Sequence, residues 1–148
     1  MTLHEHPYSA FFGLAALLFL AATLGSDVVA RITAGDGGIW KAITEHAYYA
    51  FVQPVGTATL FAPFLILGWM SATLAKGKGF DKGLGVFLLG SLLLGFMYFS
   101  GYQDYQGYMK QRMWTAATFS VGVLPLKSIP LLLICLGVRW AVARKKDR

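Results

Sequence analysis

Charged residues are scarce in this 148-residue sequence, and acidic residues are the scarcest of them. Only 14% of the residues are charged, with seven Asp and Glu against thirteen Lys and Arg, while 56% are hydrophobic. A soluble domain carries about 25% charged residues, and a core of this size has no room to bury several long apolar stretches. The composition, with a mean hydropathy of +0.56, nearly excludes a soluble globule and indicates a polytopic membrane protein.

Cysteine and the common catalytic motifs are almost wholly missing. Cys135 is the single cysteine, so one chain forms neither a disulfide nor a thiolate metal cluster. His4 and His6 precede the first apolar stretch whereas His46 falls at its far side, so the three histidines do not converge on a metal. The sequence contains no glycine-rich phosphate loop, no CxxC and no HExxH. We therefore expect no metal and no cofactor, and a non-enzymatic role is favoured while an enzyme stays open.

Four apolar stretches are each long enough to cross a bilayer. They cover approximately residues 7–28, 48–75, 83–103 and 113–139. We predict an all-α fold, with residues 1–148 forming one integral membrane bundle of four transmembrane helices. Pro54 and Pro63 predict a tilted or kinked second helix. Pro125 and Pro130 flank Lys127, so the fourth stretch is either one continuous crossing or a broken helix.

The distribution of positive charge predicts the orientation. Eight basic residues lie after the second stretch or in the tail, against four on the opposite side: Lys76, Lys78, Lys82, Arg139, Arg144, Lys145, Lys146 and Arg148 against Arg31, Lys41, Lys110 and Arg112. Cytoplasmic loops carry the excess of Lys and Arg. We therefore expect both termini in the cytoplasm and place the chain in a bacterial cytoplasmic (inner) membrane. The overall charge of +6 is explained by this topology, and no nucleic-acid partner is expected.

Lys127 is the most informative residue, because it falls inside the fourth apolar stretch. An ammonium near the bilayer midplane costs about 2.5–3.5 kcal/mol and is usually paired, hydrated or functional. It could serve as the counter-ion of a ligand, as a proton-linked site, or as half of an ion pair with a partner subunit. Alternatively the helix is shifted or broken, and the side chain snorkels to an interface or lines a watery notch.

Other polar and small residues are weaker candidates. Five of them are expected to gather as a polar cluster at the outer rim, unless they are ordinary solvated loop charges: Asp27, Arg31, Glu45, His46 and Asp104. Ser91 and Gly95 form a small-xxx-small pair that predicts close helix packing. Hydroxyls in the second and fourth stretches, including Thr59 and Thr118, are expected to bond between helices.

Aromatic residues gather near the ends of the stretches. Tyr98, Tyr102 and Tyr105 share one helical face, which we interpret as an interfacial belt, with a ligand or protein contact as the alternative. The glycine-rich segment 27–45 is expected to be a loop whose short amphipathic pattern around Trp40 lies on the outer membrane surface.

The sequence Leu124-Pro125-Leu126-Lys127-Ser128-Ile129-Pro130, with the four crossings, slightly resembles the small membrane subunit of tripartite, binding-protein-dependent secondary transporters. That family usually carries a longer basic segment between helices two and three than Lys76 to Lys82, and Glu45 matches its acidic residue only loosely. The resemblance implies a transporter subunit and identifies no site.

We therefore expect a non-catalytic subunit of a transport or channel assembly, associated with lipid and with itself or another membrane protein. The first alternative is a membrane interaction module, such as an assembly factor, a regulator or an immunity-type protein. The second alternative is a small membrane enzyme acting on a lipid or quinone.

Overall fold

The computed structural model describes residues 6–144, so His4 and the basic residues Lys145, Lys146 and Arg148 lie outside the described residues. The described chain is helical: α1 (Pro7–Leu20), a π-helical turn η1 (Ala21–Gly25), α2 (Ser26–Ala34), α3 (Ile39–Val52), α4 (Pro54–Lys78), α5 (Phe80–Lys110), α6 (Trp114–Gly122) and α7 (Leu124–Arg144). The all-α prediction is confirmed for these residues.

Four of the helical runs are long and apolar enough to cross a membrane, as the sequence predicts. They are Pro7–Ala34, Pro54–Lys78, Phe80–Lys110 and Trp114–Arg144. The second run begins at Pro54 rather than near residue 48, because the backbone at Gln53 leaves the helical region (φ −119°, ψ 63°). A residue before proline is disfavoured in the α conformation. Residues 48–52 therefore belong to the separate helix α3 and not to the second run, and most of the loop expected at 27–45 is helical, in α2 and α3.

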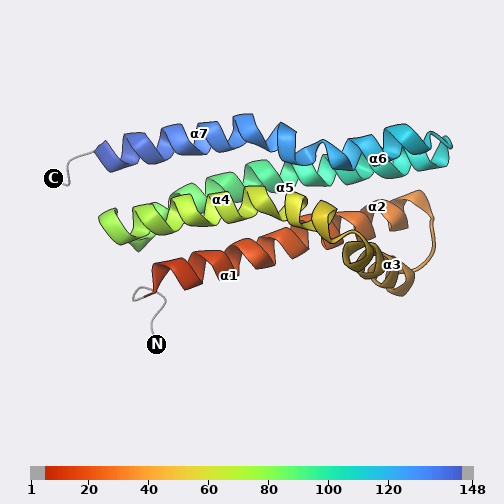
Figure 1. The fold of residues 1–148 in the computed structure, drawn as a ribbon, viewed down its shortest axis with the longest axis horizontal. Helices are drawn as coiled ribbons and strands as arrows, with labels where there is room; N and C mark the ends of the chain where they lie inside the picture. Colours follow the sequence, from red (N-terminus) through yellow and green to blue (C-terminus); the bar gives the residue numbers. More distant parts are fainter. Residues whose placement is uncertain (1–5, 145–148) are drawn as a thin grey trace.

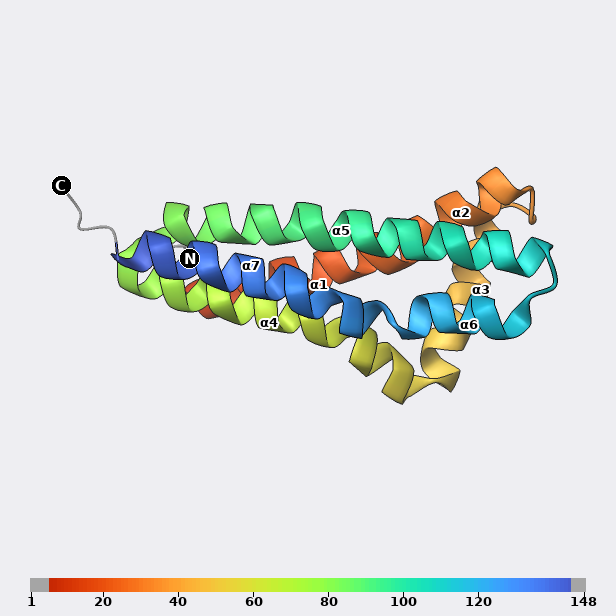
Figure 2. The same cartoon turned by 90° about the horizontal axis from the view of Figure 1, so that it is seen from above.

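The middle of the bundle is formed by α4 and α5. Figure 1 shows α1 on one side of this pair and α7 on the other, and both described chain ends lie at the same end of the molecule. At the opposite end α5 continues between α2 and α6, while α3 lies across the bundle (Figure 2). This second end contains fewer of the long helices, because α4 begins beside α3 and does not extend past it.

The α4–α5 contact depends on residues without side chains. A Cβ added at Gly83 would lie 2.6 Å from the carbonyl oxygen of Ser71, and one at Gly90 would lie 2.3 Å from Leu67. A Cβ at Gly95 would meet nothing within 4 Å, and Ser91 donates its hydroxyl to Phe87 of its own helix. Within the described chain, close packing of α5 thus involves other glycines than the predicted Ser91–Gly95 pair.

Two expectations about polar side chains in the spans are corrected. Tyr98 and Tyr102 are buried inside the bundle, so they are not belt residues, and the Tyr98 hydroxyl donates to the carbonyl of Leu60 in α4 at 2.7 Å. Thr59 and Thr118 donate to carbonyls four residues earlier in their own helices rather than across helices. A hydroxyl on a helix has such a carbonyl within reach at no packing cost.

The fourth run contains a break. The first of its two helices, α6, ends at Gly122, and α7 starts at Leu124, one residue before Pro125. The first turn of a helix tolerates proline, because a backbone N–H at that position would have no intrahelical acceptor in any case. The broken form is therefore the one the structure shows, and Lys127 lies in the first turns of α7.

We expect Gly83→Ala to destabilise the bundle by about 1–3 kcal/mol, because its new methyl group meets backbone that moves only with α4. Gly95→Ala is the matched control, since it adds the same methyl group to the same helix in open space. Thermal unfolding of the detergent-solubilised variants measures the difference. Equal midpoints would contradict the packing described for α5.

Candidate functional site

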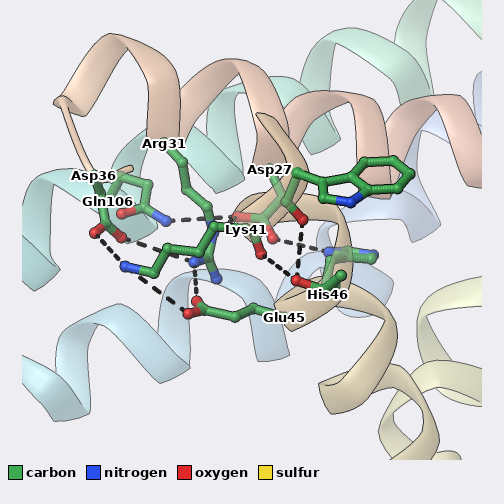
Figure 3. A network of polar contacts seen from close by, with 9 residues as sticks. Asp27, Arg31, Asp36, Lys41, Glu45, His46 and Gln106 are labelled. Carbon is green, nitrogen blue, oxygen red and sulfur yellow. Dashed lines mark hydrogen bonds and ion pairs between the residues drawn. The ribbon is translucent and has the colours of Figure 1, made fainter. Parts of the chain in front are cut away.

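A polar cluster lies at the end of the bundle away from the chain ends, where α2, α3 and α5 meet (Figure 3). The π-helical turn Ala21–Gly25 immediately precedes α2 and Asp27 occupies the first turn of that helix. Such π-helical turns are frequent at functional sites. After α2 the backbone adopts positive φ at Gly35 (73°) and Gly37 (80°), which glycine accepts readily. This turn folds α3 back onto the bundle.

The carboxylate of Asp27 is the centre of the cluster. Its side chain is 5% exposed and receives three contacts, each from a different helix. Arg31 Nε of α2 donates to it at 3.1 Å, His46 Nδ1 of α3 lies 2.9 Å from its second oxygen, and Gln106 Nε2 of α5 lies at 3.5 Å. A buried carboxylate is tolerated only when it is paired and hydrogen-bonded. Asp27 therefore joins α2, α3 and α5.

The guanidinium of Arg31 extends the cluster toward its open side. Its side chain is 7% exposed, and its Nη1 atom donates to Glu45 and lies 3.7 Å from Asp36. Lys41, which is half exposed, lies 3.3 Å from Asp36 and 3.9 Å from Glu45. Three carboxylates thus face two permanent cations and one histidine. The buried residues Asp27 and Arg31 have more polar partners in the cluster than the residues at its rim.

The structure brings together four of the five residues named for the outer-rim cluster. Asp27, Arg31, Glu45 and His46 are in contact, whereas Asp104 is exposed on α5 and has no contact with the other four. Sequence reasoning missed Asp36, Lys41 and Gln106. Gln106 had no local signal, because it reaches Asp27 across 79 positions of chain. Within the described residues, no group of three His, Cys, Asp or Glu side chains is placed to hold a metal ion.

A hollow of about 370 Å³ opens beside the cluster. Arg31, Glu45 and Gln106 form its polar wall, and Tyr49 and Tyr105 line it from α3 and α5. Both tyrosines line this hollow, so the alternative interpretation of a ligand or protein contact still applies to Tyr105.

Lys127 is placed differently. It is exposed on α7 beside the exposed side chains of Leu126 and Ile129, and it makes no ion pair or hydrogen bond with the side chain of any described residue. It lies near the middle of the fourth candidate span, Trp114–Arg144. Lys127 therefore places an ammonium group among the apolar side chains that are typical of a lipid-facing surface.

Comparison with known proteins gives limited similarity. No protein-family model matches the chain, and no solved structure matches it. One subunit of the F420H2 dehydrogenase of Methanosarcina barkeri is 26% identical over 151 residues. The match covers 86% of this chain but only 40% of that protein, so the chain spans less than half the length of this relative. The similarity is distant, and it is the four apolar helices that point to a membrane protein.

We expect Arg31→Met to lower the free energy of unfolding by about 3–5 kcal/mol, because it leaves the buried carboxylate of Asp27 without its guanidinium partner. Arg31→Lys keeps the charge but loses the fork geometry, so its effect should be smaller. Arg112→Met removes an exposed cation at the same end of the bundle and is the matched control. Chemical unfolding in detergent measures all three. A loss no greater than that of the control would show that the cluster does not stabilise the bundle.

Proposed function

We propose that the chain is a non-catalytic subunit of a membrane assembly with transport or channel activity. The observation that carries the proposal is Lys127, an exposed cation beside apolar side chains in the fourth span that pairs with no side chain among residues 6–144. Such a residue costs several kcal/mol in lipid unless a partner or water reaches it. A carboxylate presented by another subunit, or by a second copy of this chain, would remove that cost.

The length of the helix argues against simple snorkelling. Arg139, the next basic residue along α7, lies twelve positions away, which is about 18 Å along a helix. The four-carbon stem of lysine is much shorter than the distance to Arg139, so the ammonium of Lys127 does not reach that end of α7 by extending its side chain. Pairing or hydration by a neighbouring molecule is therefore the better explanation.

The interior of the bundle supports an assembly rather than a self-sufficient transporter. Phe11, Phe64, Leu67 and Tyr98 are fully buried between the helices and fill the space that a solute would need. A path for solute would then run between this chain and its partners. The similarity to a protein that is itself named as a dehydrogenase subunit is in keeping with a subunit role, and no dehydrogenase chemistry is carried over to this chain.

An interaction module without transport is the second candidate, and Gly95 favours it. Gly83 and Gly90 are closely packed, whereas the space beside Gly95 is open. Ser91 and Gly95 would then form the seam where a partner helix approaches. In that case a partner binds at the seam, and Lys127 has no part in any solute path.

The expected test of Lys127 compares three variants extracted gently from the native membrane. Lys127→Met should lose the stoichiometric partner or the homo-oligomer, while Lys127→Arg keeps the charge and should retain it. Lys76→Met removes an exposed lysine at the end of α4 and serves as the control. Native mass spectrometry reads the composition. Normal assembly of Lys127→Met would remove the main support for the proposal.

We also propose that the end of the bundle where residues 6–144 begin and end faces the cytoplasm of a bacterial cell. Lys76 and Lys78 end α4 there, and Arg139 and Arg144 belong to the last turns of α7. Excess positive charge is retained on the cytoplasmic side. A C-terminal green fluorescent protein fusion should fluoresce and a C-terminal alkaline phosphatase fusion should be inactive. The reverse pair of results would invert the topology.

A further inference from the structure

The hollow beside the polar cluster has the size and lining of a small-molecule site. Its volume of about 370 Å³ falls within the range of about 300–1,000 Å³ that ligand pockets occupy. Both charge signs line it: Arg31 and Lys110 are cationic, while Asp36 and Glu45 are anionic. Tyr49 and Tyr105 supply aromatic surface between these charges. The hollow therefore combines charges of both signs with aromatic walls.

Donors for an anionic group remain available in this hollow. Arg31 uses its Nε and Nη1 atoms for Asp27, Glu45 and Asp36, and its Nη2 atom makes no hydrogen bond with a described residue. Lys110, in the last turn of α5, makes no ion pair with any described residue. These two groups can meet one phosphate, because a guanidinium presents several donors and an ammonium can approach as a point charge.

Acceptors for a cationic group lie at the rim. The carboxylates of Asp36 and Glu45 are partly exposed, at 50% and 39%, and their second contact is the exposed ammonium of Lys41. Because Lys41 is itself half exposed, its side chain is easily replaced by another ammonium. A pure anion would be repelled by these carboxylates, and a pure cation would be repelled by Arg31 and Lys110. A group that carries both signs avoids both penalties.

The hollow also lies at the depth where lipid headgroups are found. The 31 residues of α5 extend about 46 Å, which exceeds the hydrocarbon thickness of about 30 Å. Tyr105 and Lys110 belong to the last turns of this helix, and α3 crosses the same end of the bundle (Figure 2). The exposed Trp40 and Tyr48 of α3 are residue types that favour the membrane interface. The hollow thus opens close to the boundary between hydrocarbon and water.

We propose that this hollow binds the headgroup of an amine-bearing zwitterionic phospholipid, of the phosphatidylethanolamine class. Arg31 and Lys110 contact the phosphate, and Asp36 and Glu45 accept hydrogen bonds from the primary ammonium. A quaternary ammonium lacks those N–H donors, and a glycerol headgroup lacks the positive charge. The site therefore discriminates among lipids by both ends of the headgroup.

Thermal unfolding of delipidated full-length protein in detergent tests the proposal. Phosphatidylethanolamine, phosphatidylcholine and phosphatidylglycerol with identical acyl chains are titrated separately, together with soluble O-phosphoethanolamine. A ligand that binds only the folded state raises the unfolding midpoint with concentration. We expect phosphatidylethanolamine to act at about tenfold lower concentration than the other two lipids, the ratio expected from one lost charge-assisted hydrogen bond. Equal stabilisation by all three lipids would overturn the site, and an equal effect of soluble phosphoethanolamine would overturn its assignment to a membrane lipid.

Two variants separate the ends of the headgroup. Lys110→Gln should weaken phosphatidylethanolamine and phosphatidylglycerol alike, because both carry the phosphate. Asp36→Asn should remove the preference for phosphatidylethanolamine and leave the phosphate contact intact. Arg112→Gln and Asp104→Asn are exposed controls at the same end of the bundle that do not line the hollow, and they should bind as the unmodified protein does. Unchanged lipid preference in both test variants would contradict the proposal.

Discussion

Polar groups within a bilayer have no water to bind, and the architecture of this chain follows from that constraint. Backbone groups are satisfied inside helices, and hydroxyls such as Thr59 and Ser91 donate to carbonyls of their own helix. The Tyr98 hydroxyl reaches across to the Leu60 carbonyl of α4, shortly before Pro63 interrupts that helix's own hydrogen bonding. The helices α4 and α5 also approach each other closely at Gly83 and Gly90.

Asp27 and Lys127 represent two outcomes of the same constraint. Asp27 is surrounded by a guanidinium, an imidazole and an amide from three helices, so its charge is compensated within the chain. Lys127 has no such partner among the described residues. The first charge therefore contributes to the fold of one end of the bundle. The second is the basis of the proposed association with another membrane subunit.

The two ends of the bundle have different physical roles. Near the termini α4 and α5 approach so closely at Gly83 that an added methyl group would strike backbone. At the far end α3 crosses the bundle, and it is held there by the polar contacts of Glu45 and His46, while Ala42 is the one buried residue of this helix. Dense packing leaves no space for a ligand, whereas a polar, loosely packed end leaves the hollow beside Arg31. The proposed binding site accordingly lies at that end.

The sequence alone was sufficient for the all-α class and for four helices long and apolar enough to cross a membrane, because hydrophobic length and charge are local properties that need no knowledge of neighbours. It also indicated that Asp27, Arg31, Glu45 and His46 belong at one rim. Only the tertiary structure decided the partners Gln106 and Asp36, the burial of Tyr98 and the open space beside Gly95. Each depends on which faces of distant helices meet, and a repeat of apolar residues on nearly every face of a membrane helix does not specify that choice.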